Sequence, residues 1–195
     1  MESHAIAKQK TASAYNAAAE LFDHPANTFW SRFGNNTVER LGLTTGDKVL
    51  DVCAGAGASA LPAARKVGQA GRVVAVDLAE KLLAIAQAKA AAEGLDNLEF
   101  RADDMLALGY PDGYFDAVVC VFGIFFVPDM SAAVKELWRQ VRPGGRLAIT
   151  TWGRFIRTRQ QRALASHSQR TARTLQRLQS LGSDIHPGRI VGDAV

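Results

Sequence analysis

An alternation of apolar runs and helical patterns most constrains what this chain can fold into. Each apolar run is continuously hydrophobic, which is typical of strands that are covered on both faces of a sheet. Strands connected by helices and short turns favour a parallel arrangement. The sequence therefore predicts an α/β fold with a doubly wound, mostly parallel sheet. The expected strands are 48–54, 72–78, 97–102, 115–122 and 146–151.

The segments around these runs predict the helices. Residues 59–67 and 79–93 follow the first two strands, and a third helix is expected to begin at Asp129 and to end at the Pro-Gly-Gly of 143–145. Two more helical patterns, at 11–23 and 27–42, precede the first strand. We therefore expect a helical cap over residues 1–45 and a ligand-binding core over 46–153.

Charge separates the last part of the chain from the rest. Residues 154–195 hold eight arginines, no lysine and only two acidic residues, in a stretch rich in Gln and Ser. No strand is expected there, and the composition predicts a poorly ordered or non-native tail. Nucleic acid is not the expected partner of this tail, because aromatic residues are not interleaved with its arginines.

Composition restricts the class of protein further. The chain of 195 residues is long enough for one domain with a core. Its two cysteines, Cys53 and Cys120, lie in apolar runs, which favours a reducing compartment, and no apolar run is long enough for a membrane span. We expect a soluble, cytoplasmic protein. The scattered histidines show no metal-ligand spacing.

The stretch "VLDVCAGAG" at 49–57 resembles a nucleotide-binding turn with two unusual features. Asp51 lies inside the apolar strand, and no third glycine follows Gly55 and Gly57 where a pyrophosphate loop would have one. A buried carboxylate needs partners, so Asp51 is expected to receive loop N–H groups and to lie near a cationic ligand. Glycines allow the loop backbone to approach that ligand closely.

Ligands of open parallel sheets bind beyond the carboxyl ends of the strands. These ends supply glycines and acids here but no lysine or arginine, which disfavours a triphosphate. S-adenosylmethionine, with its hydroxyls, amine and positive charge, fits better. Asp77 lies twenty residues after Gly57, the spacing at which an acid accepts ribose hydroxyls.

Other contacts with such a ligand are expected from neighbouring segments. Asp104 can accept from the adenine amino group, with Asp103 as the alternative. Tyr15 and Phe122 are candidates for aromatic faces beside the sulfonium. His24 is a candidate general base, although a lone histidine needs no functional explanation.

Five motifs in order carry a resemblance to a known family. They are "VLDVCAGAG", "VVAVDLAEKLLAIA", "FRADDM", "YPDGYFDAVVCVFGIFFVPD" and "LWRQVRPGGRLAITTWG". Together they resemble the class I S-adenosylmethionine-dependent methyltransferases, and most of all the ubiquinone/menaquinone-biosynthesis C-methyltransferases. The resemblance covers about residues 10–153.

The resemblance implies a Rossmann-like fold and a cofactor site. The implied sheet has seven strands, the last antiparallel, and the C-terminal part of this chain is expected to be truncated or aberrant, with incomplete C-terminal strands. Tyr15 would close over the cofactor from the N-terminal cap. The implied cofactor-binding residues are Asp51, Gly55, Gly57, Asp77, Leu78, Asp104, Met105, Cys120 and Tyr15.

The expected activity is in-line transfer of a methyl group to a small-molecule acceptor, and no catalytic residue is assigned. The Asp/Asn-Pro-Pro-Tyr/Phe motif of enzymes that methylate amino groups of bases is missing where "FGIFFVPD" stands. A nicotinamide-dependent oxidoreductase would share the glycine turn but would not explain Asp51. A non-catalytic cofactor-binding remnant or an interaction protein is the main alternative.

Overall fold

A six-stranded sheet with the order β3-β2-β1-β4-β5-β6 forms the centre of the molecule. The structure is a computed structural model that describes residues 4–24, 26–152 and 189–194. Neighbouring strands pair in parallel throughout. The strands are β1 (Lys48–Val52), β2 (Arg72–Asp77), β3 (Leu98–Ala102), β4 (Phe115–Val121), β5 (Val141–Thr151) and β6 (Arg189–Ala194).

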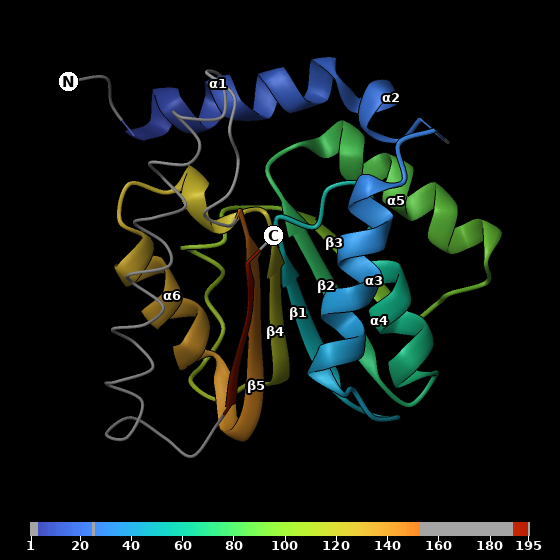
Figure 1. Ribbon diagram of the computed structural model, residues 1–195, viewed down its shortest axis with the longest axis vertical. Coiled ribbons are helices and arrows are strands. Elements are labelled where there is room, and N and C mark those ends of the chain that lie inside the picture. The colour runs from blue at the N-terminus through green and yellow to red at the C-terminus, as the bar shows by residue number, and fades with distance from the viewer. Residues whose placement is uncertain (1–3, 25, 153–188, 195) are drawn as a thin grey trace.

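Helices cover both faces of the sheet and one end of it (Figure 1). Helices α3, α4 and α5 lie on one side, α6 lies on the other, and α1 and α2 run across the top of the view. No helix among the described residues is long and apolar enough to cross a membrane. The helices are α1 (His4–Ala17), α2 (Ala19–Phe22), α3 (Phe29–Leu41), α4 (Ala60–Val67), α5 (Glu80–Ala92) and α6 (Met130–Arg139), with a 3₁₀ helix η1 (Ile124–Phe126).

Two apolar layers explain why the strands are continuously hydrophobic. Successive residues of β1 point to opposite faces, so Val49 and Leu50 belong to separate buried clusters. The cluster of Leu50 includes Leu137 of α6, and that of Val49 includes Val38 of α3. The predicted doubly wound parallel fold is confirmed. The order in which the chain adds strands to the sheet reverses between β1 and β4, and such sheets bind ligands at this switch point.

The start of β5 corrects one expectation. The Pro-Gly-Gly of 143–145 does not end α6, because the helix already ends at Arg139 and β5 begins at Val141. The pairing of β4 with β5 shifts register between Phe115 and Ala117, so the extra residues are accommodated in a bulge. Gly144 has a φ of 77° within this bulge, a value that glycine adopts without strain. Asp129 caps α6 as expected, since its side chain accepts from the Ala132 N–H.

The prediction that no strand follows Gly153 was wrong. β6 pairs in parallel with β5, with Arg146 opposite Arg189 and Thr151 opposite Ala194. The exposed edge of β5 offers hydrogen bonds that a short segment can use without a strong pattern of its own. The rest of the predicted tail, 153–188 and 195, lies outside the described residues. The division of the chain at 45 and 153 stays a prediction.

Helix α3 approaches the loop after β1 so closely that only glycine fits at the crossing. A Cβ at Gly34 would lie 2.1 Å from the carbonyl oxygen of Ala58. The same helix is fixed to β5 by a buried hydrogen bond of 2.6 Å between the Thr37 and Thr150 hydroxyls. The loop of 54–59 is therefore supported by α3.

We expect Gly34→Ala to lower the free energy of unfolding by about 2–3 kcal/mol, because overpacking outweighs the helix propensity of alanine. Urea unfolding of the full chain measures this change. Asn36→Ala, at an exposed position of the same helix, should stay within about 0.5 kcal/mol of the unchanged chain. A Gly34→Ala variant as stable as the unchanged chain would contradict the close crossing.

Candidate functional site

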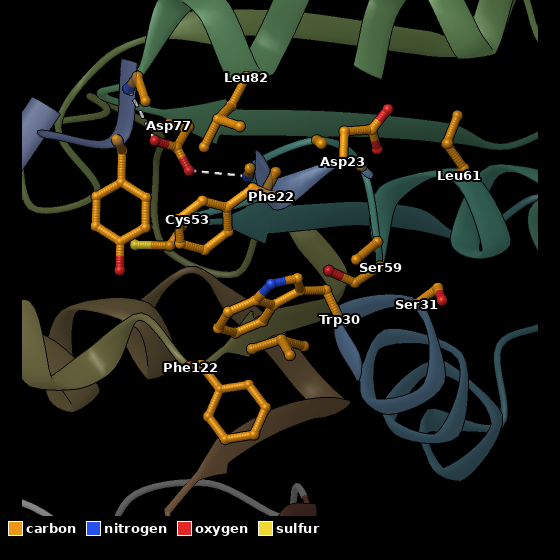
Figure 2. Close-up of a pocket in the computed structure, with 18 of the residues that line it drawn as sticks. Phe22, Asp23, Trp30, Ser31, Cys53, Ser59, Leu61, Asp77, Leu82 and Phe122 are labelled. Carbon is orange, nitrogen blue, oxygen red and sulfur yellow. Dashed lines mark hydrogen bonds between the residues drawn. The ribbon is translucent and has the colours of Figure 1, made fainter. Parts of the chain in front are cut away.

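A cavity of about 700 Å³ lies beyond the carboxyl ends of the strands, under the helical cap. Figure 2 shows Asp77 and Leu82 on one side of it and Trp30 and Phe122 on the other. Of the residues expected in a cofactor site, the ones that line the cavity are Tyr15, Gly55, Gly57, Asp77 and Leu78. The volume is in the range of small-molecule sites.

Asp77 is the anchor of this site. Its Oδ2 accepts the Gly55 N–H at 2.8 Å and its Oδ1 accepts the Ala79 N–H at 2.8 Å, as the dashed lines in Figure 2 mark. Burial raises the pKa of Asp77, and these backbone hydrogen bonds oppose the rise. A carboxylate has about four lone-pair positions, so both oxygens can accept further hydrogen bonds from a ligand.

The loop after β1 needs its glycines for a reason that the sequence did not show. Gly55 and Gly57 have φ values of 52° and 85°, in the region that favours glycine. A Cβ at Gly57 would lie 3.1 Å from atoms of Leu61 and Ala86, so α5 also packs against this position. Backbone conformation and helix packing therefore require glycine before any ligand is considered.

Asp51 lies beneath the cavity and not on its surface. Its side chain is fully buried, and neither oxygen has a hydrogen-bond partner among the described residues. Burial raises its pKa to about 7. The nearby Ser59 hydroxyl opposes this rise in pKa, and the charge of Asp77 adds to it. The expected hydrogen bonds from loop N–H groups are not present.

Three further expected residues are close to the site without lining the cavity. Asp104 contacts Lys8 of α1 and accepts the Leu106 N–H at 3.0 Å. Met105 is buried beside Cys53. Cys120 is buried in β4, and the two residues that follow it, Val121 and Phe122, line the cavity.

The alternative acid, Asp103, is already occupied by protein partners. It forms an ion pair of 2.6 Å with Arg101 and accepts the Asp104 N–H at 2.8 Å. Asp104 is engaged in the same way, by Lys8 and by the Leu106 N–H, so these contacts do not decide between the two acids.

Aromatic side chains form one wall of the cavity. Phe22 stacks on Trp30 with ring centroids 5.3 Å apart, Trp30 meets Phe122 at 5.7 Å, and Phe122 meets Trp152 at 4.5 Å. Sequence reasoning named Phe122 but missed Trp30 and Trp152. The aromatic residues clustered in "FWSRF" were the available signal.

Tyr15 joins this wall to the helical cap. Its ring lies 5.0 Å from that of Phe22 and meets Phe126 edge-on at 5.6 Å. Burial, followed by the charge of Asp77 and of Cys53, raises the pKa of Tyr15 to about 12. The phenol is therefore neutral at physiological pH and can donate a hydrogen bond.

Two cations line the cavity, in contrast to the expectation from the strand ends alone. Lys89 pairs with Asp23, and Arg65 makes two hydrogen bonds of 2.7 Å to Glu93. Both come from helices and both are paired with acids of the chain. The cavity therefore has no unpaired cation among its described residues to hold a phosphate group.

His24 is poorly arranged for the role of general base. Its Nδ1 accepts the Ala26 N–H at 3.2 Å, so the neutral ring carries its proton on Nε2. A proton taken from a substrate would have to go to the nitrogen that is already engaged. The site thus offers no evident general base in His24.

These features fit S-adenosylmethionine. Asp77 offers acceptors for ribose hydroxyls, and aromatic faces and carboxylates favour a cation. The two unpaired oxygens of Asp51 lie beneath the same loop, where a positive charge would compensate them. A triphosphate fits poorly, because the lysine and arginine here are already paired.

Comparison with known proteins gives the same assignment. Residues 5–178 match the model of the ubiE/COQ5 methyltransferase family. The chain belongs to this family. The resemblance stated from the motifs, and the Rossmann-like class I fold, are confirmed.

Individual relatives agree with the family. The chain is 37% identical to a demethylmenaquinone methyltransferase of Lactococcus lactis over 57% of this chain and 44% of the relative. It is 34% identical to the ubiquinone/menaquinone biosynthesis C-methyltransferase UbiE of Hahella chejuensis over 76% of this chain and 59% of that protein. The chain thus spans about half the length of these relatives.

A solved structure supports the fold and the cofactor class. A SAM-dependent methyltransferase from Aquifex aeolicus superposes with a TM-score of 0.63 and 27% identity, over 74% of this chain and 76% of that chain. The S-adenosylmethionine dependence of this neighbour agrees with the cofactor that the strand-end residues indicate.

The raised pKa of Asp51 predicts how stability depends on pH. Between its ordinary value and about 7, the folded chain keeps a proton that the unfolded chain loses, so stability falls as the pH rises through this window. Asp51→Asn removes this cost. We compare the free energy of unfolding of the variant with that of the unchanged chain. This difference should shift in favour of the variant by about 3 kcal/mol when the pH is raised from about 5 to about 8.

Urea unfolding of the full chain without cofactor at both pH values measures this gain. Asp96→Asn, at an exposed position, is the control and should show no such difference between the two pH values. An Asp51→Asn effect of equal size at both would contradict the burial of a protonated carboxyl group.

Proposed function

We propose that this chain is an S-adenosylmethionine-dependent methyltransferase that acts on a small, largely apolar acceptor. The observation that carries the proposal is the position of Asp77, which holds the glycine loop by one oxygen and faces the cavity at the end of β2. The family relationship supports the activity. The cytoplasmic location expected from the cysteines is part of the same proposal.

The cofactor half of the cavity is built by β1, β2 and α5. Asp77 accepts the ribose hydroxyls, while the loop at Gly55 and Gly57 forms the floor. Asp51 lies buried beneath that floor with a raised pKa, and a bound positive charge would favour its ionised form. Tyr15 covers this half from the cap, with its neutral phenol.

The acceptor half is formed by the aromatic wall. Phe22, Trp30, Phe122 and Trp152 present ring faces and edges, which favour a flat, apolar acceptor and exclude water from the place of reaction. Both cations of the lining are paired with acids, so a strongly anionic acceptor is not favoured. Relatives of the chain include a ubiquinone/menaquinone biosynthesis C-methyltransferase, which fits such an acceptor.

Bound S-adenosylmethionine supplies a methyl group on a sulfonium, which is an activated leaving group. The chain's main task is therefore positioning, and we propose an in-line transfer in which the aromatic wall holds the acceptor atom about 3 Å from the methyl carbon. No residue is proposed as general base.

Calorimetric titration of the full chain with S-adenosylhomocysteine tests the site. We expect Asp77→Ala to weaken binding at least about 100-fold, because two hydrogen bonds to a charged group are lost at about 1.5–3 kcal/mol each. Asp96→Ala, an acid outside the cavity, should bind like the unchanged chain.

A folded, unchanged chain that binds no S-adenosylhomocysteine would contradict the proposal. Equal binding by Asp77→Ala and the unchanged chain would contradict the role of Asp77. If the chain binds the cofactor but transfers no methyl group from S-adenosylmethionine to any acceptor of a quinol series, the non-catalytic alternative is favoured.

A further inference from the structure

Three sulfur-containing side chains belong to or pack against one buried cluster beneath the glycine loop, and the proposed transfer step assigns no role to their sulfur atoms. The Cys53 thiol donates to Met105 Sδ over 3.8 Å. Cys120 is fully buried, and Met105 belongs to the same buried cluster, against which Cys53 packs. The three residues come from the ends of β1 and β4 and from the segment after β3.

The backbone turns Cys53 toward the other two sulfurs. Val52 pairs with Cys120, and both side chains lie in the same cluster. The next residue along a strand would point to the opposite face. Cys53 instead has a φ of 56°, a left-handed conformation that is uncommon outside glycine, and its side chain joins that cluster.

Gly123 shows how close the two thiols are. A Cβ placed on Gly123 would lie 2.6 Å from Cys53 Sγ and 3.1 Å from Cys120 Sγ. Both thiols therefore lie within about 3 Å of one point, at a glycine that has no side chain to separate them.

The spacing suits a metal ion. With metal–sulfur bonds of about 2.3 Å, three ligands in a plane around one ion lie about 4.0 Å apart, close to the 3.8 Å between Cys53 Sγ and Met105 Sδ. Two thiols and a thioether are soft ligands, and such sets select Cu(I). Among the described residues, no group of three or more His, Cys, Asp or Glu side chains could hold a metal, so harder cations have no comparable site.

We propose that Cys53, Cys120 and Met105 form a binding site for a soft monovalent metal ion of the Cu(I) class. Binding forms two metal–thiolate bonds and one metal–thioether contact. Each thiol releases one proton to solvent, and the ion keeps its oxidation state. Because Cys53 also lines the cavity, the ion reaches the site from that side.

The test is anaerobic titration of the full chain with Cu(I), in competition with a coloured Cu(I) chelator. We expect one ion per chain. Cys53→Ala and Cys120→Ala should each lower the affinity more than about 100-fold, and Met105→Leu about tenfold. Even the residues that hydrogen-bond to metal ligands typically change metal affinity by about 10–100-fold when they are substituted. Met130→Leu, a thioether on α6 outside the cluster, should leave the affinity unchanged.

An affinity that depends on Cys53 but not on Cys120 would overturn the proposal, because it would show a single accessible thiol. No competition with the chelator would overturn it too. If Cys120→Ala does not fold, X-ray absorption spectroscopy of the Cu(I)-loaded unchanged chain decides: three sulfur ligands on the ion are expected, and a single sulfur ligand contradicts the site.

The metal site does not depend on methyl transfer. A chain that binds Cu(I) as expected but no S-adenosylhomocysteine would contradict the proposed function alone.

Discussion

The hydrogen bond from the Gly55 N–H to Asp77 Oδ2 ties together the two strand ends on which the site depends. It fixes the loop after β1 against the end of β2. This loop lies next to the point between β1 and β4 where the strand order reverses. The same carboxylate also accepts the Ala79 N–H and so sets the start of α5. A single half-buried acid thus orients the loop, the helix and the cavity wall.

Charge at this place follows from burial. Burial raises the pKa of both Asp51 and Asp77, and the charge of Asp77 adds to the rise at Asp51. With its lysine and arginine already paired, the cavity is a favourable environment for a positive ligand. This physical property, more than any one contact, separates the site from those of phosphate-binding relatives of the fold.

The sequence predicted the features that depend on local pattern. Continuous apolar strands, the position of Asp77 and the cap of α6 at Asp129 all follow from spacing along the chain. The features it missed depend on distant contacts. β5 begins before the Pro-Gly-Gly because a bulge accommodates these residues, β6 uses the free edge of β5, and Lys8 meets Asp104 across 96 positions of the sequence. Trp30 and Trp152 reach the cavity only once α3 and β5 are placed side by side.

A crystal structure of the full chain with S-adenosylhomocysteine would test the central claim most directly. The account predicts both ribose hydroxyls at about 2.5–3.0 Å from the oxygens of Asp77, with the sulfur facing the aromatic wall of Trp30 and Phe122. A ligand bound elsewhere, or a ribose held by other residues while Asp77 contacts only Gly55 and Ala79, would contradict it.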